Sequence, residues 1–568
     1  MNSPTARLEG MTTREAVVNT LIELDAQYAF TLPGLGITWM LGEFHAHRKD
    51  LRVVLTRSEQ VASIMAQVVG KLTGKPGVYM GQGPFAGTTG AFGILEAYFA
   101  GSPMVVLTDT SCYDGFGMYG VYQTMTGDYG AADIRTVLKT MTKATWYVTE
   151  PHESVYALQQ AWKQASLPRQ GPTAVVLKSS IIKRDMTQNA RTQLYPSAGY
   201  LHTVMPQPDS QAIRKLAAML NAAERPVMIA GNGMQNARGR AAVAALAEHA
   251  GMAVATSYNA KGVVDETSAI AAGMLGTWGM KSANTAVQEA DLLLVVGASL
   301  GPDYLKFRDP DFIRPAEQRI VQIDVDPRNA GWVYPTGLSI CADGADALEA
   351  LLAEKPETAQ RQARLDWIAG LHARHPVPAI EEAPAPGTLG HGDIIRVLDD
   401  FLTPDDLLTL DAGSNRIWAT TSLRIRTPGQ LIVPGGIGGM GWGAPAAAAV
   451  KLVHGERNVI SLTGDGGFAM TMNVLSTCVQ ENLPITVVVA NNAGLGMVRD
   501  NLGERRIAVD FAPTDFARIA RGMGCVGISV NTREALREAL EAARHSGRTT
   551  VIDVTVDPMS SHVGVSDY

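Results

Sequence analysis

The chain has 568 residues, of which 46% are hydrophobic and 18% are charged, and its formal net charge is -7 at pH 7. At roughly 100–200 residues per domain, this length predicts three to four domains with a large buried core. The acidic balance argues against nucleic acid as a partner, and no run of about 18 apolar residues is long enough to span a bilayer.

The cysteines and the N-terminal segment indicate in which cellular compartment the protein is expected. The four cysteines stand apart in the sequence, at positions 112, 341, 478 and 525. This spacing predicts neither a disulfide framework nor a zinc site. The first residues lack the apolar stretch of a secretion signal, so we expect a protein of the reducing cytoplasm.

Two polar stretches divide the chain into three blocks of similar size. Residues 186–204 are polar and aperiodic, and residues 375–391 are rich in proline and alanine. Each proline discourages helix at the residue before it. We therefore expect three domains, at 10–185, 205–370 and 390–560.

Within each block, short β-branched runs alternate with amphipathic stretches. This alternation predicts an α/β fold with three doubly wound parallel-sheet domains, in which ligands bind at the carboxyl ends of strands. The expected strands are 53–55, 78–80 and 104–107, then 227–230, 292–296 and 320–325, and finally 407–410, 459–462, 485–490 and 551–556.

In the first block a helix is predicted from Ser58 to about Thr73, directly after the strand at 53–55. Glu59 stands in its first turn, where an acid stabilises the helix dipole, and for this residue alone that role is sufficient. A glutamate in an apolar site also has a raised proton affinity, which would let it hold a proton at neutral pH. The first block leaves both roles open.

In the third block two consecutive strands end in polar motifs. Thr463-Gly-Asp-Gly-Gly467 follows one strand, and Asn491-Asn492 follows the next, with 24 residues between Gly466 and Asn491. Both motifs reach the same sheet edge, where carboxylate, amide and carbonyl oxygens suit Mg²⁺ with phosphate oxygens completing its shell. Glycines 464, 466 and 467 let the backbone approach a diphosphate, and a helix start beyond Gly467 would offer it free N–H groups. An ordinary turn would explain Gly-Asp-Gly alone, but not the Asn-Asn pair at this spacing.

This pattern resembles the binding signature of the thiamine-diphosphate (ThDP) enzymes. The resemblance implies that Asp465 and Asn492 bind Mg²⁺ through side-chain oxygens and Gly494 through its carbonyl. Residues 58–78 are similar to the glutamate helix of the family. The resemblance therefore implies that Glu59 is catalytic and shares a proton with N1′ of the cofactor's pyrimidine, so that the 4′-imino group becomes the base.

A second glycine-rich segment, Gly435 to Pro445, resembles the family segment that bends the cofactor into a V. The Gly438 carbonyl would accept from the 4′-amino group, and Met440 would be the apolar wedge under the bend. A glycine-rich loop with a core methionine is the alternative. The expected cofactor-binding residues are Gly413, Ser414, Asn415, Gly438, Met440, Gly464, Asp465, Gly466, Gly467, Asn492, Gly494, Gly496 and Met497.

The resemblance covers essentially the whole chain and points to the acetolactate (acetohydroxyacid) synthases. Tyr122-Gln123 is similar to their Phe-Gln pair, which makes Gln123 the second expected catalytic residue. Asn501 stands where the synthases carry a tryptophan that favours 2-ketobutyrate as acceptor. Residues 298–302 replace their Arg-rich flavin stretch, and a lone Gly231-Asn-Gly233 is weak evidence for a dinucleotide. FAD therefore stays an open alternative that the sequence does not favour.

The leading hypothesis is a ThDP- and Mg²⁺-dependent 2-keto-acid decarboxylase/carboligase, an acetolactate synthase-like transferase that passes an acyl anion to a second carbonyl. Cleavage of an α-diketone or acyloin by a lyase or hydrolase is the enzymatic alternative, and fold alone does not separate the two. A non-catalytic ThDP-binding homologue is the third hypothesis, against which Glu59 argues. In this family the site forms across a subunit interface, which implies a homodimer at least, and often a homotetramer.

Overall fold

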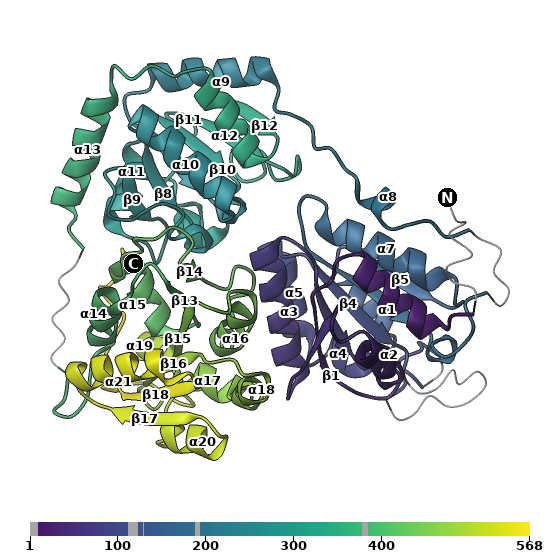
Figure 1. Ribbon diagram of the computed structural model, residues 1–568. Helices are drawn as coiled ribbons and strands as arrows, with labels where there is room; N and C mark the ends of the chain where they lie inside the picture. Colours follow the sequence, from purple (N-terminus) through teal and green to yellow (C-terminus); the bar gives the residue numbers. More distant parts are fainter. Residues whose placement is uncertain (1–9, 112–122, 129, 188–192, 378–383, 568) are drawn as a thin grey trace.

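The computed structural model describes residues 10–111, 123–128, 130–187, 193–377 and 384–567 (Figure 1). These residues form three six-stranded sheets, each with all its strands parallel, interleaved with helices. The predicted fold class, α/β with three parallel-sheet domains, is confirmed.

The first sheet has the strand order β2-β1-β3-β4-β6-β5. Its strands are β1 (Tyr28–Leu32), β2 (Arg52–Leu55), β3 (Gly77–Gly81), β4 (Met104–Asp109), β5 (Thr145–Val148) and β6 (Pro172–Leu177). Its helices are α1 (Thr13–Glu23), η2 (Ile37–Met40), α2 (Leu41–Ala46), α3 (Glu59–Thr73), α4 (Gly83–Gly87), α5 (Ala91–Ala100), α6 (Ile134–Lys139), α7 (Glu153–Ser166) and η3 (Ser179–Ile181). The Ser58 hydroxyl caps α3 by accepting from the N–H of Val61 at 3.2 Å, which fixes Glu59 as the first residue of that helix.

The second sheet has the order β12-β11-β10-β7-β8-β9. Its strands are β7 (Pro226–Ala230), β8 (Ala253–Thr256), β9 (Ala271–Met274), β10 (Leu292–Val296), β11 (Arg319–Asp324) and β12 (Leu338–Cys341). Its helices are α9 (Ser210–Ala222), η4 (Asn232–Met234), α10 (Ala237–Ala250), η5 (Tyr258–Ala260), α11 (Lys281–Glu289), η6 (Pro302–Arg308), α12 (Gly344–Ala353) and α13 (Arg361–Arg374), and α8 (Ala198–Leu201) precedes them.

The third sheet has the order β14-β13-β15-β16-β18-β17. Its strands are β13 (Asp406–Leu410), β14 (Leu431–Ile432), β15 (Asn458–Gly464), β16 (Thr486–Asn491), β17 (Val526–Val530) and β18 (Thr550–Thr555). Its helices are α14 (His391–Phe401), α15 (Ser414–Ser422), α16 (Gly443–Val453), α17 (Asp465–Thr471), α18 (Val474–Glu481), α19 (Gly496–Leu502), α20 (Phe516–Gly522) and α21 (Arg533–Ser546). The expected helix start beyond Gly467 is wrong, because α17 already begins at Asp465. The Asp465 carboxylate accepts from the N–H of Gly466, as acids at helix starts do.

The first and third domains share one hydrophobic core, in which α3 lies against both α5 and α16 (Figure 1). Helix α16 contains four consecutive buried alanines, 446–449, whose small side chains let the helices approach closely. The indole of Trp442 donates to the side-chain oxygen of Gln67 at 3.0 Å across this interface. The sheet of the diphosphate motifs is therefore fixed against the domain that carries Glu59.

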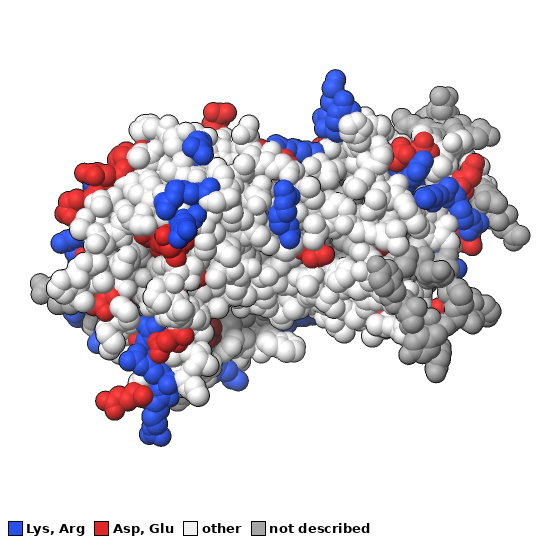
Figure 2. All heavy atoms as spheres, turned by 90° about the horizontal axis from the view of Figure 1, so that it is seen from below, with Lys and Arg blue, Asp and Glu red and all other residues white. Residues whose placement is uncertain are grey.

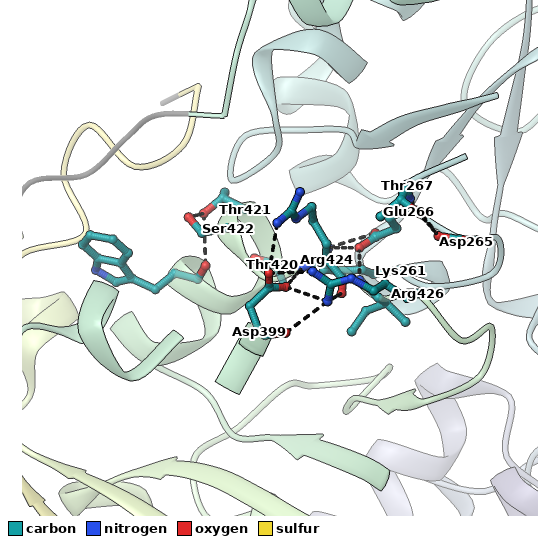
Figure 3. Close-up of polar contacts among 12 residues, drawn as sticks. Lys261, Asp265, Glu266, Thr267, Asp399, Thr420, Thr421, Ser422, Arg424 and Arg426 are labelled. Atoms are coloured by element: carbon teal, nitrogen blue, oxygen red, sulfur yellow. Dashed lines mark hydrogen bonds and ion pairs between the residues drawn. The ribbon is translucent and has the colours of Figure 1, made fainter. Parts of the chain in front are cut away.

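A buried carboxylate of the middle domain, paired within its own domain, bonds to the backbone of the third domain (Figure 3). The ammonium of Lys261 lies 2.7 Å from a carboxylate oxygen of Glu266, and both side chains are buried. The same carboxylate accepts from the N–H of Ile425 at 2.9 Å, in the third domain. Arg424 and Arg426 both pair with Asp399 beside it. Because a buried charge is costly to leave unpaired, this contact fixes the relative position of the two domains.

The surface carries charges of both signs. On the face that Figure 2 shows, acidic and basic side chains are interspersed, and the middle of the face has few of either. Of the helices in the described ranges, none has the length and apolar character needed to cross a membrane. Cys341, Cys478 and Cys525 are free thiols, and Cys112 lies outside the described residues.

Candidate active site

The two diphosphate motifs meet at the carboxyl edge of the third sheet. Strands β15 and β16 are parallel neighbours, with Gly464 opposite Ala490, so Asp465 and Asn492 emerge side by side. Each is only 4% exposed. The backbone N–H of Gly494 donates to Oδ2 of Asp465 at 3.0 Å. The structure thus brings together the three residues predicted to bind the metal.

Asp465 is a buried carboxylate without a paired cation. Burial raises its pKa to about 6, and hydrogen bonds from Gly466 and Gly494 offset only part of this effect. Over the described ranges, no basic side chain lies within ion-pair distance of it. The same ranges contain no cluster of three His, Cys, Asp or Glu side chains that could hold a metal. A hard cation that completes its shell with amide, carbonyl and phosphate oxygens fits this donor set.

A third loop of the predicted diphosphate site, residues 413–415, lies against the loops of residues 463–467 and 492–497. The buried hydroxyl of Ser414, at the start of α15, has no hydrogen-bond partner among the described residues. A Cβ added to Gly496 would lie 3.2 Å from that hydroxyl and 2.7 Å from the amide nitrogen of Asn492. The loops of residues 413–415 and 492–497 therefore converge closely, with the unsatisfied Ser414 donor between them. This arrangement suits an anionic ligand.

Two buried acids that the sequence analysis missed hold the glycine-rich loop. Glu96 on α5 is fully buried, and its carboxylate accepts from the N–H groups of Gly435 and Gly436 at 2.6 Å and of Gly438 at 3.1 Å. From the third domain, Asp411 accepts from the N–H groups of Gly441 and Gly443. The only sequence signal for Glu96 was a lone acid in an apolar helix. The conformation of the loop, with Gly438 at a φ of 60°, is therefore set by both domains.

Glu59 lies at the carboxyl edge of the first sheet, half-buried, where the hydroxyl of Thr89 donates to it at 3.2 Å. The preceding strand, β2, packs against α18 of the same chain: the hydroxyl of Thr477 donates to the carbonyl of Leu55 at 3.2 Å. For the part of the chain described, no hydrogen bond or ion pair joins Glu59 to the three diphosphate loops. Within the described ranges, one chain therefore does not join Glu59 to the residues predicted to bind the metal and the diphosphate.

Gln123 belongs to a polar cluster at the same edge of the first sheet. The amide nitrogen of Gln82 donates to the side-chain oxygen of Gln123 at 2.7 Å and to the Ser111 hydroxyl at 2.9 Å. Burial raises the pKa of the adjacent Asp109 to about 7. Tyr122, predicted beside Gln123, lies outside the described residues.

The remaining predicted residues border the same region. Met440 and Met497 are half-buried, in the glycine-rich loop and in α19 respectively, whereas Asn501 is exposed on α19. At the carboxyl edge of the middle sheet, Gly231 and Gly297 approach so closely that a Cβ on Gly231 would lie 2.2 Å from the Gly297 carbonyl. This close approach of the backbone after β7 to the backbone after β10 is enough to explain why residue 231 is a glycine, without a bound dinucleotide.

Comparisons with known proteins match the whole domain order. Residues 11–130 match the N-terminal TPP binding domain of the thiamine pyrophosphate enzymes, residues 213–351 the central domain, and residues 411–554 the C-terminal TPP binding domain. The chain is 30% identical to the acetolactate synthase large subunit of Corynebacterium glutamicum over 566 residues, which cover 96% of this chain and 87% of that protein. It is 28% identical to a probable acetolactate synthase large subunit of Methanocaldococcus jannaschii and to a putative thiamine pyrophosphate-containing protein of Bacillus subtilis, each over 96% of this chain and 92% of the relative. The chain therefore belongs to the thiamine pyrophosphate enzymes, as a ThDP-dependent enzyme related to acetolactate synthase large subunits over nearly its whole length.

Proposed function

We propose that this enzyme is a Mg²⁺-dependent 2-keto-acid decarboxylase and carboligase of the acetolactate synthase type. When bound, ThDP supplies the electron sink for carbon–carbon bond cleavage. In the net reaction a keto acid loses CO₂, its acyl carbon forms a bond to the carbonyl carbon of a second substrate, and that carbonyl oxygen takes a proton. The observation that carries the proposal is the convergence of Asp465, Asn492 and Gly494 in a chain with these relatives.

The third domain would hold the diphosphate. Asp465 and Asn492 bind Mg²⁺ through their side chains and Gly494 through its carbonyl, which neutralises the buried carboxylate described above. The Ser414 hydroxyl, which has no protein partner, donates to a phosphate oxygen. Gly464, Gly466, Gly467, Gly413, Asn415 and Gly496 form the surrounding backbone.

The glycine-rich loop would orient the pyrimidine. Its Gly438 carbonyl accepts from the 4′-amino group, and Met440 supports the bend of the cofactor. Glu96 binds three N–H groups of this loop, so the carbonyl is oriented before the ligand arrives. Such preorganisation avoids a reorganisation cost during the reaction.

A second copy of the chain would supply Glu59. Glu59 makes no contact with the diphosphate loops of its own chain over the described ranges, so the proposal requires the partner's copy of α3 at each site. Large apolar side chains are exposed on both domains that would meet: Leu35 (42%) and Phe99 (53%) on the first, Met470 (49%) and Val479 (43%) on the third. We therefore infer a homodimer at least, with a homotetramer as the common state of the family, in the cytoplasm.

FAD is not part of the proposal. A cleft of about 430 Å³ lies at the carboxyl edge of the middle sheet, but Asp324, Asp343 and Arg169 all line it, so its charges do not favour a pyrophosphate in particular. Residues 298–302 stand where the synthases carry their Arg-rich flavin stretch. We expect purified protein to lack stoichiometric flavin absorbance.

The test is a substrate screen of pure protein with ThDP and Mg²⁺ on pyruvate, aryl keto acids and α-diketones, with identification of the products. We expect CO₂ release and a hydroxyketone product. Because Asn501 is exposed and provides no indole wall, we also expect no preference for 2-ketobutyrate over pyruvate when both acceptors are equimolar. Cleavage of a diketone without keto-acid turnover would replace this proposal with a lyase or hydrolase.

A further inference from the structure

A small cavity lies between the middle domain and the glycine-rich loop. Its volume is about 110 Å³, well below the roughly 300–1,000 Å³ of sites for larger ligands. It is lined by Tyr258, Asn259, Met274, Leu275, Trp278, Asp303, Tyr304, Arg416, Ile417, Thr420 and residues 434–438. A compact molecule fits this space, and a dinucleotide does not.

Arg416 brings a permanent positive charge to this cavity. It lies on α15, directly after Ser414 and Asn415 of the predicted diphosphate loop, and its guanidinium lies 5.0 Å from the ring centre of Tyr258. A Cβ added to Gly438 would lie 3.4 Å from Nη1, so the cation adjoins the carbonyl predicted to hold the pyrimidine. Throughout the described ranges, no acid lies within ion-pair distance of the guanidinium and no acceptor takes a hydrogen bond from it, although Asp303 lines the same cavity. Its five N–H donors are free for a ligand.

Two further polar groups of the cavity wall lack partners. The hydroxyl of Tyr258 and the side-chain oxygen of Asn259 are both buried, and neither has a hydrogen-bond partner in the part of the chain that the structure describes. Burial raises the pKa of Tyr304 to about 12, and that of Tyr258 further, so both phenols stay neutral donors at physiological pH. The Tyr258 hydroxyl can donate and, together with Arg416, favours an anionic group, whereas the Asn259 oxygen can only accept.

The walls of the cavity are held in place by contacts outside it. Lys261 directly follows η5, which carries Tyr258 and Asn259, and its buried pair with Glu266 ties that segment to Ile425 in the third domain (Figure 3). Asn259 also donates to the Gly435 carbonyl at 2.9 Å. The guanidinium and the aromatic wall are therefore preorganised relative to each other and to the loop.

We infer that this cavity binds the anionic group of the second substrate, the carbonyl compound that accepts the acyl group, and that Arg416 holds it. The inference rests on the proposed function. A salt bridge to the donor's own carboxylate would stabilise the ground state of a group that must leave as CO₂, whereas the acceptor keeps its anionic group throughout. The planar guanidinium suits a carboxylate, a sulfonate or a phosphate in two parallel hydrogen bonds.

The kinetic test compares two small acceptors, glyoxylate with a carboxylate and acetaldehyde without one, using Arg416→Gln, Arg416→Lys and the exposed control Arg518→Gln. For Arg416→Gln we expect KM for glyoxylate to rise roughly 10- to 100-fold, as for the loss of a charged hydrogen bond. The KM for acetaldehyde, the kcat at saturation and CO₂ release from pyruvate with a dye as electron acceptor stay near wild type. Arg416→Lys recovers part of the loss, because it keeps the charge but not the bidentate geometry.

A binding test separates this inference from the proposed reaction. Calorimetric titration of acetate, methanesulfonate and inorganic phosphate into wild type and Arg416→Gln identifies which anion the cavity takes. Binding that depends on Arg416 supports the inference even if no keto acid is turned over, which would overturn only the proposed function. Equal losses for glyoxylate and acetaldehyde, loss of CO₂ release, anion binding unchanged in Arg416→Gln, or stoichiometric flavin in the purified protein would each overturn the inference.

Discussion

At the scale of single residues, Asp465 is the residue on which the proposed metal and diphosphate site depends most. It is buried, unpaired with any described cation and bonded to the backbone of Gly494. A carboxylate in this state stabilises the fold poorly by itself, because desolvation disfavours its charge. The proposed Mg²⁺ would account for this placement and would offset the cost of the buried charge.

Asp465→Ala removes the only charged protein ligand in the proposed metal shell. We expect the affinity for ThDP in the presence of Mg²⁺ to fall by more than about 100-fold, since even outer-shell partners contribute about 10- to 100-fold. Calorimetric titration measures this, with the exposed Asp405→Ala as the matched control. An unchanged dissociation constant would place the metal elsewhere.

At the scale of elements, α14 depends on a buried histidine at its first residue. His391 is 4% exposed, and its Nδ1 lies 2.8 Å from the Ser560 hydroxyl of the C-terminal segment. Burial, with a smaller contribution from His562, lowers its pKa to about 4, while Asp500 opposes the shift. In the unfolded chain the pKa of this histidine is near 6.5, so between about pH 4 and pH 6.5 the unfolded chain binds more protons than the folded chain.

The neutral His391 makes its full contribution to the free energy of unfolding above about pH 6.5. As the pH falls toward 4, up to about 3 kcal/mol of that free energy is lost. We expect the thermal midpoint to drop between pH 7 and pH 5, and to drop less in His391→Asn. The exposed His545→Asn should keep the wild-type slope. The same slope in His391→Asn as in wild type would assign the effect to another group.

Helices and strands could be predicted where a single short sequence pattern determines them. Strand β10 was predicted residue for residue, because Leu292–Val296 is a fully buried apolar run between Asp291 and Gly297. The half-exposed strands β5 and β17 lack such a run and were not named. The start of α17 was misplaced because glycines hide a helix boundary.

At the scale of the whole molecule, contacts between domains limit what the sequence shows. Asp465, Asn492 and Glu59 belong to local motifs and could be proposed from spacing. Glu96 meets Gly435 across 339 residues, and Arg416 gains its neighbours only when the middle domain docks. No local pattern encodes either contact.

The proposed dimer predicts complementation between two inactive variants. In a mixed dimer of Glu59→Gln and Asp465→Ala, one site carries both changes and the other carries neither. Random exchange should therefore restore about a quarter of wild-type activity, because half of the dimers of a twofold-symmetric protein are then mixed. Activity that stays absent after demonstrated subunit exchange would mean that each site is built from one chain.

The central claim, that Glu59 activates ThDP held at Asp465 and Asn492, is tested most directly by proton exchange at C2 of the bound cofactor, followed by NMR. We predict that Glu59→Gln still binds ThDP but slows this exchange by about 100-fold or more, as expected for loss of acid–base catalysis. The exposed Glu504→Gln serves as control and should exchange like wild type. Exchange in Glu59→Gln as fast as in wild type, with the cofactor shown to be bound, would contradict the account.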